Sequence, residues 1–225
     1  MLAIHTPISV LGQESDLSLI LTGNLTTSSE LYPNPNAADA FLRSQSYVVE
    51  DFYGAGFEVR YRIPESAIAI GIAADYVHAP LSRSLTIASR GGIPVEDGYE
   101  AIPVEVTGYF IIPASGPRFG IFMGGGIGAY FGRRTYRLAG VEAPTVDRRP
   151  GFGIHVLGGV SYRFIERLSV IGQMKFRDLQ FETSNQFPTG QITYNGAVIN
   201  VGQEAFESRV NTDGVVFQLG IALHL

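Results

Sequence analysis

Hydrophobic residues recur at every second position through eight segments of the chain. The segment from Phe119 to Phe131 is an example, because bulky apolar side chains there alternate with Gly120, Gly124 and Gly126. Strict alternation is typical of a β-strand, whose successive side chains point to opposite faces, and helical periodicity is scarce. The pattern predicts strands at residues 15–25, 51–63, 67–78, 102–112, 118–132, 151–164, 168–181 and 215–225.

The connections between these segments alternate in length: three are short, and four are long and rich in Pro, Asn, Ser and Gly. Short turns at one end and long loops at the other are typical of outer-membrane barrels. We therefore predict an all-β fold, an eight-stranded antiparallel up-and-down transmembrane β-barrel with four long external loops and three short periplasmic turns. The turns are residues 64–66, 114–117 and 165–167, and the loops are residues 26–50, 79–100, 133–150 and 182–214.

The two faces of the predicted strands differ in a way that assigns the outside of the barrel. One face carries bulky apolar residues on nearly every strand, and the other carries glycine, alanine and isolated charges. An eight-stranded barrel has an interior only just wide enough for side chains, so its lumen must contain many small residues. The apolar face is therefore expected to contact lipid, whereas a soluble barrel would place it inside.

Pairs of aromatic residues flank three of the predicted strands on this apolar face. Their spacing within each strand suits the two interfaces of a bilayer, which a strand of about 9–11 residues crosses. Such pairs predict the aromatic girdles of a membrane barrel. They are Tyr53 with Tyr61, Phe119 with Phe131, and Phe152 with Phe164.

The composition of the 225-residue chain agrees with a wall that contacts lipid. Only 16% of the residues are charged, against about 25% in an average globular protein, and the basic residues are 15 Arg and one Lys, Lys175. The absence of Cys excludes disulfides, thiolate metal sites and a Cys nucleophile. A net charge of −5 argues against nucleic-acid binding. No apolar run approaches the roughly 18 residues of a membrane-spanning helix.

These features resemble the small eight-stranded outer-membrane barrels of Gram-negative bacteria, the OmpX-like and OmpW-like families, over residues 15–225. The last strand matches the family pattern of alternating apolar residues, although it ends in Leu instead of Phe or Trp. The resemblance implies an integral outer-membrane protein that contacts outer-membrane lipid and lipopolysaccharide, and a last strand that the barrel-assembly machinery reads. The residues of this C-terminal assembly signal are Phe217, Leu219, Ile221, Leu223 and Leu225.

Residues 1–14 precede the predicted barrel. The stretch from Met1 to Gly12 is moderately apolar, has no Lys or Arg, and is shorter than a full signal peptide. Val10 and Gly12 have the spacing of a signal cleavage site. Two interpretations stay open: a residual signal segment and an extended N-terminal arm.

Charged residues on the predicted lumen face form the first candidate site. Buried charges must be paired, or each costs several kcal/mol, and adjacent strands here supply both signs. The favoured interpretation is a salt-bridged plug that fills the lumen, and the alternative is a proton or ion pathway. The network comprises Glu58, Arg60, Arg62, Asp75, Glu105, Arg163, Lys175 and Arg177.

A second candidate site lies in the third long loop, where arginines outnumber carboxylates. The arginine fork matches phosphate geometry, and the phosphates nearest to an external loop belong to lipopolysaccharide. This loop is therefore expected to contact lipopolysaccharide phosphates or an acidic partner. Its arginines are Arg133, Arg134, Arg137, Arg148 and Arg149.

Catalytic and metal chemistry have weaker support. His78, Ser82 and Asp75 lie close in sequence near a strand end, which permits a lipid A-modifying enzyme, but they match no motif. The histidines are isolated from one another, so no metal or cofactor site is expected. We expect no enzyme, but a barrel whose external loops act in envelope integrity, adhesion or partner binding, including as a subunit of a larger envelope complex. The alternative is an OmpW-like pore for small hydrophobic molecules.

Overall fold

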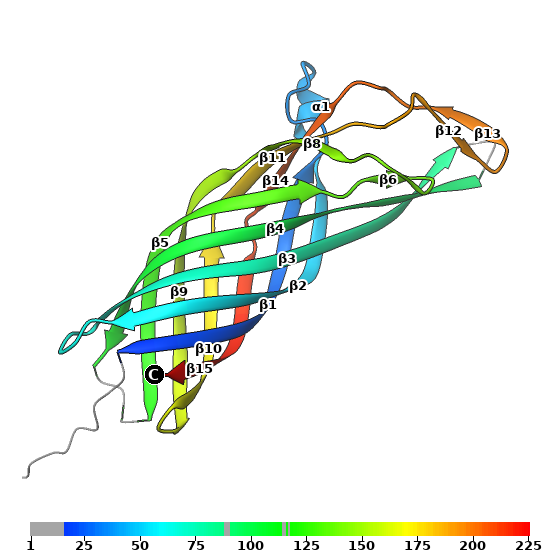
Figure 1. Cartoon of the computed structure of the whole chain (residues 1–225). Coiled ribbons are helices and arrows are strands. Elements are labelled where there is room, and N and C mark those ends of the chain that lie inside the picture. The colour runs from blue at the N-terminus through cyan, green and yellow to red at the C-terminus, as the bar shows by residue number, and fades with distance from the viewer. Residues whose placement is uncertain (1–15, 88–90, 114–115, 117) are drawn as a thin grey trace, which may run out of the picture.

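The computed structural model describes residues 16–87, 91–113, 116 and 118–225. Eight long antiparallel strands follow one another around a ring (Figure 1), which closes because β15 pairs with both β10 and β1. The predicted eight-stranded barrel is confirmed, and residues 1–14 lie outside the described residues. The ring consists of β1 (Leu17–Tyr32), β2 (Tyr47–Arg62), β3 (Ile68–Ile87), β4 (Gly91–Ile112), β5 (Phe119–Arg134), β9 (Gly151–Ile165), β10 (Leu168–Arg177) and β15 (Val215–His224).

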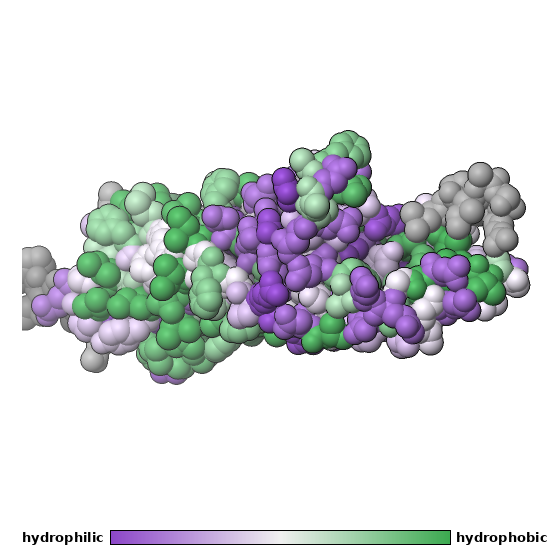
Figure 2. Space-filling view, turned by 90° about the horizontal axis from the view of Figure 1, so that it is seen from above, coloured by the Kyte–Doolittle hydropathy of each residue, from purple (hydrophilic) through white to green (hydrophobic). Residues whose placement is uncertain are grey.

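Alternate side chains of each ring strand point to opposite sides of the wall. On β15, Val216, Gln218 and Ala222 are at most 5% exposed, whereas Leu219 and Ile221 are 67% and 55% exposed. Figure 2 shows the hydrophobic surface gathered toward one end of the molecule and a hydrophilic surface beyond it. The prediction that the bulky apolar face is the outer one is confirmed. Such a band is the surface that a membrane barrel presents to lipid.

The long connections contain far more regular structure than the sequence pattern predicts. The strands β3 and β4 continue through most of residues 79–100, which we expected to be a loop. The reason is that the alternation changes phase along β4. Ile102 and Val104 point outward into the lipid-facing band, whereas Val95 and Tyr99 point inward and are each 1% exposed. Outside the bilayer the apolar face packs inside the barrel and the polar face contacts water, as in a soluble barrel.

The remaining long connections also fold into short elements at this external end, opposite the three tight turns. The strands β11 and β14 pair with each other and extend the barrel wall, and β8 pairs with β11. The pair β12 and β13 forms a separate hairpin. The elements are α1 (Ala40–Ser44), β6 (Arg137–Leu138), β7 (Val141–Glu142), β8 (Thr145–Arg149), β11 (Leu179–Asn185), β12 (Gln191–Tyr194), β13 (Ala197–Asn200) and β14 (Phe206–Thr212).

Close backbone contacts mark the level at which the wall changes its pairing. Pro150 separates β8 from β9, and Asp178 separates β10 from β11. Just past the first break, a Cβ atom on Gly151 would lie 1.4 Å from the carbonyl oxygen of Gln180, and one on Gly153 would lie 1.9 Å from that of Asp178. Only glycine permits this approach, so these two positions allow β11 to cross against β9.

The buried apolar residues form three clusters along the barrel. The cluster nearest the tight turns includes Ile20, Tyr109 and Phe122. A second cluster lies in the external part of the barrel and includes Tyr99 and Phe181, whose rings meet edge to face at 5.8 Å. A third, around β6 and the segments that lead to β12 and β14, packs beneath the external connections. Among the described residues, no helix is long and apolar enough to cross a bilayer.

Candidate functional site

Two ion pairs cross the lumen between strands that are not neighbours. Nη2 of Arg177 on β10 lies 2.8 Å from Oδ2 of Asp75 on β3, and Nζ of Lys175 on β10 lies 2.5 Å from Oε2 of Glu105 on β4. The strands β10 and β3 are separated by β9, β5 and β4 on one side and by β15, β1 and β2 on the other. The pair between Arg177 and Asp75 therefore joins opposite walls of the barrel.

These four charged groups form one compact cluster. Nε of Arg177 also lies 3.6 Å from Oε1 of Glu105, so the two pairs share a carboxylate. All four residues are at most 5% exposed, and two cations balance two carboxylates. The hydroxyl of Tyr130 donates a hydrogen bond to Glu105 at 3.4 Å. Because removal of one partner would leave a buried charge uncompensated, the four groups are expected to act as a unit.

A second layer lies closer to the tight turns. Nε and Nη2 of Arg60 donate to the two carboxylate oxygens of Glu58 at 2.8 and 3.1 Å. The guanidinium also lies over the Tyr109 ring, 3.9 Å from its centroid, and 4.9 Å from that of Phe122. Arg60 therefore bridges a carboxylate and two aromatic rings in the middle of the lumen.

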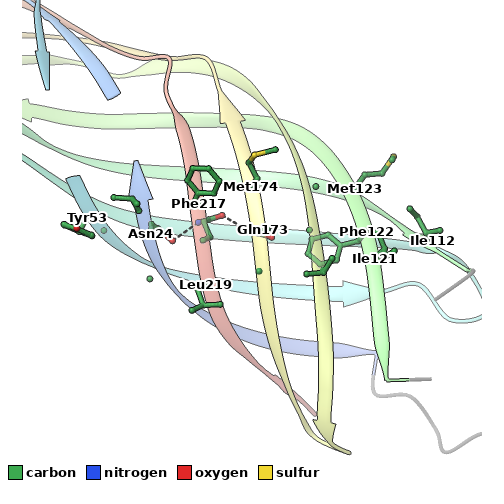
Figure 3. A pocket seen from close by; sticks show the side chains of 18 residues that line it. Asn24, Tyr53, Ile112, Ile121, Phe122, Met123, Gln173, Met174, Phe217 and Leu219 are labelled. Atoms are coloured by element: carbon green, nitrogen blue, oxygen red, sulfur yellow. Dashed lines mark hydrogen bonds between the residues drawn. The ribbon is translucent and has the colours of Figure 1, made fainter. Parts of the chain in front are cut away.

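Neutral polar side chains complete the lumen lining. Nε2 of Gln173 donates to Oε1 of Gln218, and Nε2 of Gln218 donates to Oδ1 of Asn24 at 2.9 Å, which links three adjacent strands (Figure 3). His155 shares a 2.8 Å hydrogen bond through Nε2 with the hydroxyl of Thr107. All of these side chains are buried on the inner face of the wall, and the sequence pattern alone does not identify their partners.

The structure brings six of the eight predicted lumen charges into these two layers and places the other two elsewhere. Arg62 and Arg163 line a pocket of about 230 Å³ at the end with the tight turns, together with Arg118 and His224. Both ring nitrogens of His224 have hydroxyl partners, Ser18 at 2.8 Å and Ser169 at 2.7 Å. This mouth of the barrel is therefore rich in arginine.

The arginine set predicted for external contacts needs one correction. Arg134 is 3% exposed and points into the barrel, where Nε and Nη2 donate to the two oxygens of Asp97 at 2.8 and 2.7 Å. Its Nη1 donates to the hydroxyl of Ser208 on β14 at 2.6 Å. Arg83 pairs with the same aspartate at 2.8 Å. The expectation was wrong because residues 133–150 were treated as one loop. Arg133 and Arg134 are adjacent on β5 and therefore face opposite sides of the wall.

The other four arginines of the set lie on the outer surface, and three of them form ion pairs. Arg133 lies 2.6 Å from Glu100, and Arg137 lies 2.6 Å from Glu96. Arg149 approaches three carboxylates at 3.4 to 3.6 Å. Asp147 lies on the same strand as Arg149, and the other carboxylates come from other strands, so the excess of positive charge seen along the sequence is reduced in space. Arg148 is exposed on β8.

The residues considered for catalysis do not meet. Asp75 points into the lumen, where it binds Arg177, whereas His78 and Ser82 point outward on the same strand. Nδ1 of His78 lies 3.6 Å from Glu100. A nucleophilic serine needs a histidine within hydrogen-bond reach, and the two are four residues apart along an extended strand, roughly 13 Å. Among the described residues, no group of three His, Asp or Glu side chains could hold a metal ion.

The residues of the predicted assembly signal form an exposed stripe on the outside of β15. Phe217, Leu219, Ile221 and Leu223 range from 38% to 67% exposed, and Leu225 is 60% exposed. The strand pairs with β1 from Ser18 opposite His224 to Thr26 opposite Val216. It therefore closes the barrel, and its reading by assembly machinery stays a prediction.

A pocket of about 920 Å³ is lined by residues from both sides of the wall (Figure 3). Exposed Met123 and Leu219 contribute to it, and so does buried Gln173. Outward-facing glycines keep the pocket open, since a Cβ atom on Gly23 or Gly172 would have its nearest neighbour 4.0 or 3.9 Å away. Sequence reasoning assigned glycines to the lumen and did not identify this outer set.

Known protein families give no match to this chain: no family model matches it. No curated protein matches it either. Several solved structures, in contrast, align with it over most of its length. The outer membrane protein OprG from Pseudomonas aeruginosa aligns with a TM-score of 0.60 and 12% identity over 93% of this chain and 96% of its own. Neisserial surface protein A aligns with a TM-score of 0.51 and 10% identity over 94% of this chain and 98% of its own. This chain therefore has the fold of the small eight-stranded outer-membrane barrels.

Proposed function

We propose that this protein is a non-conducting, non-enzymatic integral outer-membrane barrel whose external extension binds a partner at the cell surface. The external extension consists of the outer parts of β3 and β4 together with α1, β6, β7, β8, β11, β12, β13 and β14. The observation that carries the proposal is the ion-pair cluster that joins β10 to β3 and β4 across the lumen. Buried aromatic residues fill the barrel on both sides of this cluster, with Tyr109 and Phe122 toward the tight turns and Tyr99 toward the external end. An interior filled in this way favours a structural barrel over a channel.

The external extension supports a role in binding because its described residues form regular elements and display apolar side chains. Phe41 and Leu42 on α1 are 70% and 43% exposed. The helix begins after Asp39, whose carboxylate caps it by accepting a 2.8 Å hydrogen bond from the backbone N–H of Phe41. Val146 and Val198 add further exposed apolar surface, each 54% exposed. Large exposed aromatic side chains are frequent anchors of protein interfaces.

A partner at α1 is tested by photo-crosslinking in intact cells. A photoreactive phenylalanine analogue replaces Phe41, and the matched control carries it at Leu219 on the lipid-facing wall. We expect a protein adduct from position 41 that the control lacks. The protein in the adduct is then identified and purified on its own. The double variant Phe41→Ser with Leu42→Ser should bind this partner at least about tenfold more weakly than the wild-type barrel does. Adducts to lipid alone from position 41, or unchanged binding of the double variant, would contradict the proposal.

A second candidate function is the passage of small hydrophobic molecules through the wall. The specific observation that favours it is the 920 Å³ pocket, because lipid-facing Met123 and Leu219 and lumen-facing Gln173 and Asn24 all line it. Bulky residues in place of the outward glycines, as in Gly23→Leu with Gly172→Leu, would fill this pocket. Uptake of a hydrophobic dye into liposomes that contain the protein would fall in this variant if the wall conducts, and both proteins would match empty liposomes if it does not.

A further inference from the structure

Two ladders of outward-facing residues run side by side across β3, β4 and β5. The lower ladder is apolar and consists of Tyr76, Ile102 and Phe131, each between 48% and 51% exposed. The upper ladder is polar: His78 lies opposite Glu100, and Glu100 lies opposite Arg133. The two ladders are two residues apart on each strand, which is roughly 7 Å. The edge of the lipid-facing band is therefore sharp on this side of the barrel.

A pocket of about 480 Å³ spans this edge. Tyr76, Ile102 and Phe131 line its apolar part, while Arg133 and Arg148 line its polar part. Arg148 comes from β8, which is separate from β9 because the strand is interrupted at Pro150. The pocket therefore brings together a lipid-facing surface and two arginines from separate segments.

The polar part of the pocket carries a positive charge in excess. Arg133 has one carboxylate partner, Glu100, whose Oε2 lies 2.7 Å from Nε and 2.6 Å from Nη2 of the arginine. Its Nη1 does not take part in this contact. Within the described part of the chain, the guanidinium of Arg148 has no hydrogen bond or ion pair; its backbone N–H binds Asp147. Two arginines thus face one carboxylate at the bilayer edge.

We propose that this pocket binds the phosphorylated headgroup of an outer-leaflet glycolipid, the lipid A part of lipopolysaccharide. Arginine binds phosphate through paired, charge-assisted hydrogen bonds, which a headgroup at this level would receive from Arg133 and Arg148. The acyl chains of the same molecule would lie against Tyr76, Ile102 and Phe131. The position of the pocket selects a lipid over a soluble anion, because only a lipid contacts both ladders at once. The site is separate from α1 and does not rest on the proposed partner.

The proposal is tested by measuring lipid A bound to the detergent-purified barrel by native mass spectrometry. Arg133→Gln with Arg148→Gln should weaken binding about tenfold or more, since both charge-assisted contacts to the phosphate are removed. The matched control, Arg43→Gln with Arg167→Gln, removes the same charge from two exposed positions outside the pocket, on α1 and on the tight turn before β10, and should bind as the wild type does. A lysine pair at positions 133 and 148 keeps the charge without the fork and should give an intermediate affinity.

Two further probes separate a lipid from a free anion. Lipid A without its phosphates should bind about tenfold more weakly than intact lipid A. Inorganic phosphate alone should not displace intact lipid A at equal concentration. Wild-type affinity in the glutamine pair, equal binding of dephosphorylated lipid A, or displacement by inorganic phosphate would each overturn the proposal. Heat-modifiable migration on gels confirms that every variant compared is folded, and the lysine pair serves as the test if the glutamine pair is not.

Discussion

The guanidinium of Arg177 on β10 and the carboxylate of Asp75 on β3 lie 2.8 Å apart across the full width of the barrel. Lys175 and Glu105 form a parallel link at 2.5 Å, and Arg177 connects the two at 3.6 Å. Opposite walls of the barrel are therefore joined through side chains as well as through the closed sheet. This cluster is the main support for the non-conducting barrel that we propose.

Removal of one member of the cluster should destabilise the barrel strongly. Arg177→Ala leaves Asp75 and Glu105 buried with one cation between them, so the free energy of unfolding should fall by about 3–5 kcal/mol. Urea unfolding of the protein folded in detergent measures this change. Arg43→Ala, on the exposed α1, is the control and should change stability by less than about 0.5 kcal/mol. A similarly small effect at Arg177 would show that the pair contributes little.

Arg134 should be important for the external extension and of little consequence for the lipid-embedded wall. Arg134→Gln breaks the paired hydrogen bonds to Asp97 and weakens the contact between β5 and β14. Hydrogen exchange should then accelerate in β14 and in the external part of β4, while the pairing of β10 with β15 stays protected. Uniform acceleration along the barrel would contradict a local role for Arg134.

Glycine positions offer a matched pair of substitutions. Gly151→Ala forces a Cβ atom to within 1.4 Å of the Gln180 carbonyl oxygen, whereas Gly158→Ala has its nearest neighbour 4.0 Å away. The first should destabilise the barrel by about 1–3 kcal/mol or more through overpacking. The second should be close to neutral. Urea midpoints of the two variants, compared with the wild type, test the crossing of β11 against β9, and equal midpoints would argue against it.

If the outer face of β15 contacts lipid, the free-energy cost of a charged substitution there should depend strongly on its depth in the bilayer. Leu219 lies on the outside of β15 and is 67% exposed, between Phe217 and Ile221. Leu219→Arg should cost about 2–4 kcal/mol if the position faces the bilayer interior. Val198→Arg, on the external hairpin of β12 and β13, should cost far less. Folding yields into lipid vesicles compare the two, and an unaffected yield for Leu219→Arg would contradict the placement of the band.

The lipid-embedded part of the fold was predictable because its alternation is strong and unbroken. On β4, the exposed positions Ile102, Val104 and Val106 follow the period of two that the pattern requires. The external part was not predictable in the same way, because the apolar residues change to the inner face above the bilayer. Val95 and Tyr99 are buried by this change, and the segment that holds them looks like a polar loop in sequence.

The sequence predicts on which face of the barrel wall the charged residues of the candidate sites lie, but not which residues they contact. Alternation placed Asp75, Glu105 and Arg177 in the lumen, yet it does not say which of them meet. The meeting of Arg177 with Asp75 depends on the stagger of the strands around the closed ring, which the order of the segments leaves open. The burial of Arg134 was missed because a run of arginines was treated as one loop, although adjacent strand positions face opposite sides.

Conductance in planar lipid bilayers measures whether the barrel is sealed, as we propose. The purified wild-type protein is reconstituted, and an open porin in the same lipid serves as the positive control. We predict no single-channel steps above the leak of the protein-free bilayer, because the pair between Arg177 and Asp75 and the aromatic clusters fill the lumen. Reproducible steps from the folded wild-type protein would show that the lumen conducts ions and is not sealed.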